Sequence, residues 1–85
     1  MQTIDDHINS LLQSKRSVRF KELQRILFEL GFQMRQQKRG GSHYVFKRPG
    51  LRDFVVLVSH GSNDVVPEYQ VRQTVKVLRQ LKEQI

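Results

Sequence analysis

Hydrophobic residues recur at intervals of three and four along three segments of the chain, a spacing that places them on one face of a helix. Residues 3–14 form the first predicted helix, with Thr3 as N-cap and two acidic residues in the first turn. Residues 19–30 form the second, and Gly31 follows where a helix end favours a left-handed residue. The third begins at Pro67 and runs almost to the C-terminus. The three stripes are Ile4, Ile8, Leu11 and Leu12; Phe20, Leu23, Leu27 and Leu30; and Val71, Val75, Leu78 and Leu81.

Between the second and third helices the pattern changes to the one typical of β-strands. Residues 32–36 alternate between apolar and polar side chains, residues 43–47 follow the turn-forming segment 38–42, and residues 54–58 form a continuous hydrophobic run. A second turn is predicted at residues 48–53. Short turns between successive strands predict an antiparallel meander, whose one apolar face the helices must cover. The predicted fold class is therefore α+β, in the order α-α-β-β-β-α.

Composition excludes several classes of protein. Eighty-five residues are enough for one small domain. The chain has no cysteine, which excludes disulfides, thiolate catalysis and cysteine-bound zinc or iron–sulfur clusters. No apolar run is long enough for a membrane helix, and the acidic N-terminus is unlike a signal peptide. We expect a cytoplasmic protein without a membrane partner.

Charge points to a polyanionic partner. Fifteen Lys and Arg residues outnumber eight Asp and Glu residues, for a net charge of +7. Residues 35–52 contain no Asp or Glu, whereas the first fourteen residues contain no Lys or Arg. A solvated surface usually mixes its signs, so a stretch of one sign favours a polyanionic partner, meaning nucleic acid, an acidic protein or an anionic membrane surface, over solubility alone. The basic residues of the stretch are Arg35, Lys38, Arg39, Lys47, Arg48 and Arg52.

His43 is the candidate catalytic residue. It follows Gly40, Gly41 and Ser42 and begins a predicted strand inside the basic stretch. Glycines allow a ligand to approach the backbone closely, and exposed backbone N–H groups bind phosphate. An imidazole takes and gives protons near neutral pH, as the activation of a ribose 2′-hydroxyl beside a phosphate requires, without a metal. The alternative, which spacing alone favours, is that the glycines form a hairpin turn and His43 is an ordinary strand residue.

The other polar residues indicate neither a metal site nor a covalent nucleophile. His7, His43 and His60 are far apart in the sequence, and the acidic residues are scattered in turns and helix starts. Ser42 and His43 are neighbours in an extended segment and so point to opposite faces, which argues against a Ser–His nucleophile. His60, after the third strand, is either a second proton carrier or a loop residue without a role. We expect no metal and no cofactor.

Two aromatic residues share one face of the second predicted strand. Tyr44 and Phe46 have the spacing that would let them stack on bases, as aromatics of single-stranded RNA binders do. Packing in the core is the more frequent position of aromatics in a three-stranded meander, and we favour it for Phe46.

Three segments of the chain resemble the HicA toxins of bacterial type II toxin–antitoxin systems. They are Phe20-Lys-Glu-Leu to Leu30-Gly-Phe32, then Arg35-Gln-Gln-Lys-Arg-Gly-Gly-Ser-His-Tyr-Val-Phe46, and the tail that begins Val66-Pro-Glu-Tyr-Gln-Val-Arg-Gln73. The resemblance covers residues 17–82. It makes residues 1–85 a single HicA-like domain, in which residues 1–16 are an N-terminal helical extension that many shorter members lack.

The resemblance implies a fold like that of the double-stranded-RNA-binding domain and a metal-independent endoribonuclease that cleaves mRNA. It also implies inhibition by a HicB-like antitoxin. The family's catalytic histidine corresponds to His43, and its Gly-Ser pair to Gly41 and Ser42. Two positions depart from the family pattern: Gly40 adds a second glycine to the loop, and Tyr44 stands where many members repeat the histidine.

The leading hypothesis from the sequence is a ribonuclease toxin. Its RNA-binding residues are Arg35, Lys38, Arg39, Gly41, Ser42, Lys47 and Arg48, and His43 acts either as general base on the 2′-hydroxyl or as general acid to the leaving 5′-oxygen. One alternative is a non-catalytic RNA- or DNA-binding module that uses the same basic surface. Another is an interaction protein whose basic face binds an acidic partner.

Overall fold

Three α-helices lie where the hydrophobic spacing predicts them. The computed structural model describes residues 2–36, 43–59, 61 and 63–84. Helix α1 spans Ile4–Gln13, α2 spans Phe20–Glu29 and α3 spans Glu68–Gln84. Thr3 caps α1 through a capping box, in which its hydroxyl accepts from the Asp6 backbone N–H and its own N–H donates to the Asp6 carboxylate. Among the described helices, none is long and apolar enough to cross a membrane.

The C-terminal end of α2 sets the start of the sheet. Gly31 has a φ of 91°, and its N–H donates to the Phe28 carbonyl while the Phe32 N–H donates to the Leu27 carbonyl. These two bonds form a Schellman motif, which needs a left-handed residue at the position of Gly31. Because the Phe32 N–H is used to end the helix, the first strand begins one residue later than the alternation predicts.

The sheet is the predicted antiparallel meander. Strands β1 (Gln33–Gln36), β2 (His43–Lys47) and β3 (Val55–Val58) pair in the order β1-β2-β3. Between β2 and β3, Gly50 has a φ of 85° and follows Pro49 in a turn closed by the Leu51 N–H and the Arg48 carbonyl. This is the sequence pattern of a type II turn. The α+β prediction is confirmed, and the arrangement is consistent with a dsRBD-like fold.

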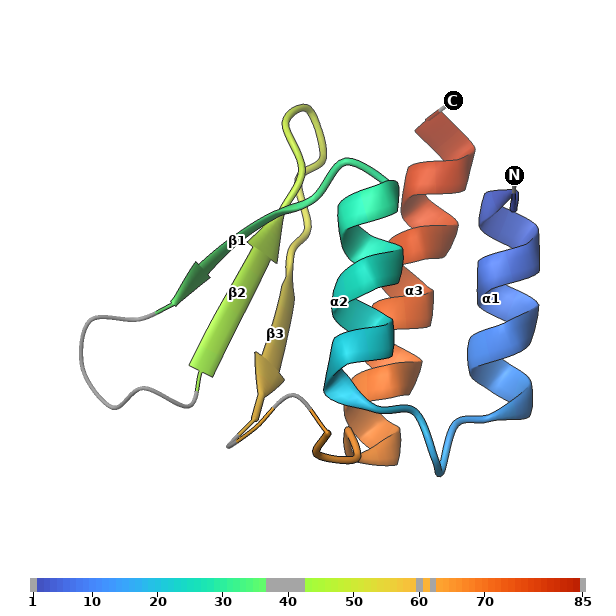
Figure 1. Ribbon diagram of the computed structural model, residues 1–85. Coiled ribbons are helices and arrows are strands. Elements are labelled where there is room, and N and C mark those ends of the chain that lie inside the picture. The colour runs from blue at the N-terminus through green and yellow to red at the C-terminus, as the bar shows by residue number, and fades with distance from the viewer. Residues whose placement is uncertain (1, 37–42, 60, 62, 85) are drawn as a thin grey trace.

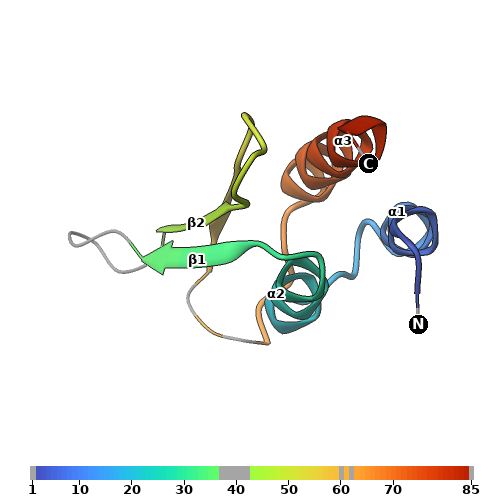
Figure 2. The same cartoon turned by 90° about the horizontal axis from the view of Figure 1, so that it is seen from above.

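The helices form two layers on one side of the sheet. Helices α2 and α3 lie between the sheet and α1, and α1 is the element farthest from the strands (Figures 1 and 2). Ile8 and Leu11 of α1 are buried in the same hydrophobic core as Phe46 and Leu57 of the sheet. Two helices therefore cover one face of the sheet, and among the described residues no helix lies on the other face.

Candidate nucleic-acid interface

The two faces of the sheet differ in character. Phe46, Val55 and Leu57 point into the core and are at most 1% exposed. The side chains between them alternate to the opposite face, which we call the open face. The pairing register aligns its residues in rows across the strands. In the described strands the open face comprises Gln33, Arg35, His43, Val45, Lys47, Val56 and Val58.

His43 lies at the end of the open face. It is the first residue of β2, it pairs with Val58 of β3, and it is exposed. Two residues further along β2, Val45 pairs with Arg35, so Arg35 is a diagonal neighbour of His43 on the same face. The register therefore places an accessible imidazole and a guanidinium on the same face of adjacent strands.

Three of the predicted RNA-binding cations line one hollow between the open face and the turn after β2. Arg35, Lys47 and Arg48 line a hollow of about 300 Å³, together with Gln33, Pro49 and Leu51. None of these lining residues is acidic, so the field inside the hollow favours an anion.

Arg48 also has a structural contact. Its Nε–H donates to the Leu30 carbonyl at 2.9 Å, at the C-terminal end of α2. The side chain lies so close to Gly31 that a Cβ added there would be 3.2 Å from Nε. Arg48 thus joins the end of α2 to the turn after β2, while Arg35 and Lys47 are exposed.

Four predicted RNA-binding residues lie outside the described part of the chain. Lys38, Arg39, Gly41 and Ser42 belong to the segment between β1 and β2, as does Gly40, and the structure does not describe this segment. His60 is likewise outside the described residues. Their roles remain predictions from the sequence.

The aromatic residues of β2 belong to the core. The ring centre of Tyr44 is 5.0 Å from that of Phe20, and the centre of Phe46 is 6.4 Å from that of Phe20 and 6.0 Å from that of Phe28. The core position favoured for Phe46 is confirmed, and Tyr44 packs on the same side. Neither ring is on the open face.

Phe54 is the residue that the sequence patterns did not single out. It is 48% exposed, and the Nζ of Lys47 lies 5.5 Å from the centre of its ring. The signal was alternation along the chain. If the chain is already extended at residue 54 and Val55 faces the core, the side chain of residue 54 lies on the open face. The continuous hydrophobic run 54–58 hid this signal.

His7 lies away from the interface. It is 1% exposed in α1, and its Nε2 is 3.3 Å from the Glu29 carboxylate. It lines a second hollow, of about 760 Å³, together with Ile4, Leu30 and Leu81, and Arg48 also lines this hollow. In the described ranges, no group of three His, Asp or Glu residues could hold a metal ion. The structure does not bring the described histidines together.

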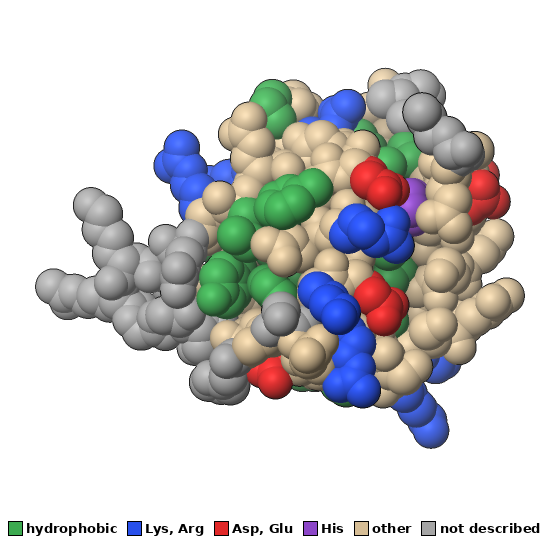
Figure 3. All heavy atoms as spheres, viewed as in Figure 1, with side chains coloured by type: hydrophobic (Ala, Val, Ile, Leu, Met, Phe, Trp, Pro, Cys, Tyr) green, Lys and Arg blue, Asp and Glu red, His purple; other side chains and the backbone are tan. Residues whose placement is uncertain are grey.

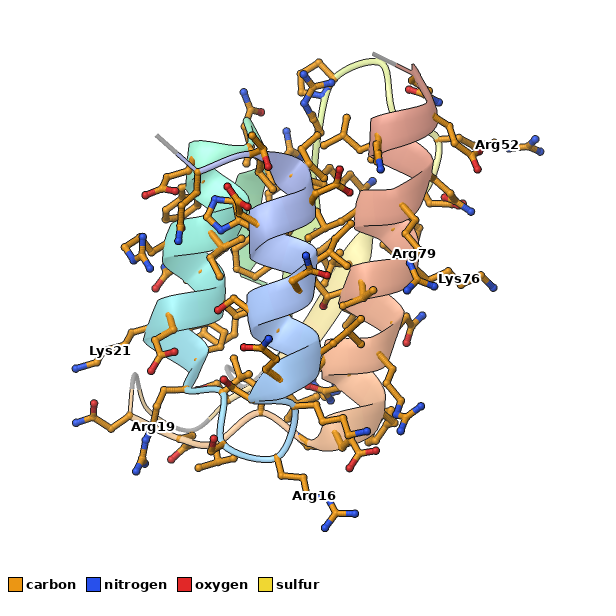
Figure 4. All side chains as sticks on the ribbon, turned by 90° about the vertical axis from the view of Figure 1, so that its right-hand side faces the viewer. Arg16, Arg19, Lys21, Arg52, Lys76 and Arg79 are labelled. Atoms are coloured by element: carbon orange, nitrogen blue, oxygen red, sulfur yellow. The ribbon has the colours of Figure 1, made fainter. Side chains whose placement is uncertain are left out.

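The helical side of the molecule carries both signs of charge. Acidic and basic side chains lie next to one another on the face centred on α2 (Figure 3), and Arg25 and Glu29 of that helix form an ion pair at 2.9 Å. Lys76 and Arg79 extend outward from α3, and Arg52 extends on the same side (Figure 4). The strands' open face differs because its described charged side chains are all basic.

The comparison with protein families concerns most of the chain. The family model described as the HicA toxin of bacterial toxin–antitoxin systems matches residues 20–82. The chain belongs to the HicA toxin family. The match begins at the first residue of α2 and includes the whole sheet, so it contains the open face and His43 and leaves α1 outside. Membership of the HicA family implies a cognate antitoxin as partner. No curated protein and no solved structure shows significant similarity to the chain.

Proposed function

We propose that this HicA-family protein is a metal-independent endoribonuclease that cleaves mRNA with His43. The observation that carries the proposal is the position of His43: an exposed imidazole on a sheet face whose charged described side chains are basic. Acid–base catalysis on RNA needs a titrating group beside a surface that binds phosphate.

The RNA backbone is bound by the cations of the open face and by Arg48 of the turn after β2. The hollow lined by Arg35, Lys47 and Arg48 holds one phosphate. Lys38 and Arg39, together with the backbone N–H groups of Gly41 and Ser42, directly precede His43 in the sequence and complete the RNA-binding set that the family resemblance implies.

The chemistry is an internal transesterification. The 2′-oxygen attacks the adjacent phosphorus, the bond from phosphorus to the 5′-oxygen breaks, and a 2′,3′-cyclic phosphate forms. One proton leaves the 2′-hydroxyl and one joins the 5′-oxygen. His43 performs one of these transfers, as base or as acid, and basic side chains stabilise the charge that develops on the phosphate.

Replacement of His43 tests the proposal. We expect His43→Ala and His43→Gln to lower the cleavage rate of a defined RNA by a factor of about 10²–10⁴. Both variants should bind the RNA nearly as well as the parent and unfold at the same temperature, because the side chain is exposed. Cleavage at the parental rate would overturn the role of His43. RNA binding without cleavage by the parent protein would favour the non-catalytic binding module.

A further inference from the structure

A half-exposed aromatic ring lies beside Lys47 of the open face. Phe54 is 48% exposed, and its described ring contact is with Lys47, itself an exposed residue. Phe54 immediately precedes Val55, which pairs with Phe46, and this register places Phe54 beside Lys47. The ring therefore extends the row that also contains Gln33.

An aromatic ring beside a cation on a basic surface can bind both parts of a nucleotide, its base and its phosphate. A base stacks on an aromatic face whatever its identity, and a neighbouring lysine binds the phosphate. Stacking requires a base that is not already enclosed in a duplex, so such a platform selects single-stranded RNA. Tyr44 cannot serve, because it packs against Phe20 on the covered side of the sheet.

We propose that Phe54 is a stacking platform for an unpaired base of the RNA substrate, an inference that rests on the proposed function. Phe54 is four residues from Val58, the partner of His43, which at the rise of a strand corresponds to about 13 Å. The stacked base belongs to a nucleotide that flanks the scissile phosphate and is not the one attacked. Phe54 thus positions single-stranded RNA along the face from the hollow to His43.

Binding measured in the His43→Ala background tests this role, since the RNA then stays intact. We expect Phe54→Ala to weaken binding of a single-stranded oligonucleotide about tenfold, because stacking on an aromatic side chain contributes on this scale. Phe54→Tyr should retain the parental affinity, because the ring remains. Binding of the same sequence as a duplex should be unchanged by either substitution.

Phe28→Ala is the matched control. Phe28 is 46% exposed, close to the value for Phe54, but it belongs to α2 on the covered side of the sheet. Its replacement should leave binding of the oligonucleotide unchanged. An equal loss in the Phe28 and Phe54 variants, or an unchanged affinity in Phe54→Ala, would overturn the proposal.

A scan with single abasic nucleotides locates the stacked base. In protein that retains Phe54, removal of the base at one nucleotide position should lower the affinity about tenfold. Phe54→Ala should lower the affinity for that abasic oligonucleotide no further. Independent losses at every position would contradict the platform. Cleavage is measured separately, with protein that retains His43. If this protein cleaves RNA but Phe54→Ala binds normally, only the stacking inference fails. If stacking is observed but no cleavage, only the proposed function fails.

Discussion

Arg48 differs from the other cations of the hollow because its side chain bonds to the backbone at the end of α2. Its Nε–H donates to the Leu30 carbonyl, one of the C-terminal carbonyls of α2 that lack a partner within the helix. Arg35 lines the same hollow but is exposed. We therefore expect the two arginines to differ in their effect on stability.

Methionine substitutions at Arg48 and Arg35 should separate the two effects. Arg48→Met keeps an unbranched apolar chain but removes the hydrogen bond, and we expect the free energy of unfolding to fall by about 1–2 kcal/mol. Arg35→Met should change it by less than about 0.5 kcal/mol. Both should weaken RNA binding. Urea denaturation gives the stabilities, and equal midpoints for the two variants would show that the contact of Arg48 does not support the fold.

At the scale of elements, the alternation of side chains gives β2 one face that packs in the core and one face that is exposed. Its even-numbered residues Tyr44 and Phe46 pack toward α2 and α3, and its odd-numbered residues His43 and Lys47 face outward. Substitutions on the open face should therefore affect RNA binding with little change in stability.

Charge reversal on the sheet tests this separation. Arg35→Glu with Lys47→Glu should weaken binding of single-stranded RNA across sequences and reduce the slope of log K against log salt by about 1.4, the share of two phosphate contacts. Lys76→Glu with Arg79→Glu is the control, because these cations extend from α3, on the other side of the sheet (Figure 4). Titrations at several salt concentrations measure both. Equal slopes for the two double variants would place the RNA elsewhere.

Local patterns were sufficient to predict the elements. The capping residues of α1, the glycine after α2 and the alternation in the strands each depend on neighbours in the sequence, and the observed elements begin within one residue of the predicted starts. The packing of α1 on the helices and not on the sheet was not predictable, because an apolar stripe does not specify its partner. The contact of Arg48 with Leu30 spans 18 residues and leaves no local signal.

The candidate site was predictable only in part. The basic stretch and the family resemblance placed His43, Arg35, Lys47 and Arg48 in one surface, and the structure brings the three cations together. Phe54 was missed because a hydrophobic run gives no sign of which face a residue occupies until the register with β2 is known. The exposure of its ring is a property of the assembled sheet.

At the scale of the whole molecule, the layers leave one face of the sheet for partners. The cognate antitoxin that HicA membership implies would bind a basic protein, and an acidic partner would be steered to the basic open face. We propose that a HicB-like antitoxin covers His43 and the basic surface between residues 35 and 52.

Competition tests this occlusion. Saturating antitoxin should prevent the His43→Ala variant from binding RNA, because a covered surface does not depend on chemistry. Size-exclusion chromatography with labelled RNA distinguishes the complexes. A stable ternary complex of toxin, antitoxin and RNA would show that the antitoxin binds elsewhere, for example on α1 around Ile8 and Leu11.

The central claim is that His43 cleaves RNA without a metal, and the ends of the products test it most directly. A defined single-stranded RNA is incubated with the purified protein in excess EDTA, with His43→Ala as the control, and the new termini are identified. We predict undiminished cleavage by the parent protein, cleavage slower by a factor of about 10²–10⁴ by the variant, and products that end in a 2′,3′-cyclic phosphate or a 3′-phosphate. Cleavage that EDTA abolishes and magnesium restores, or products with a 3′-hydroxyl, would contradict the account.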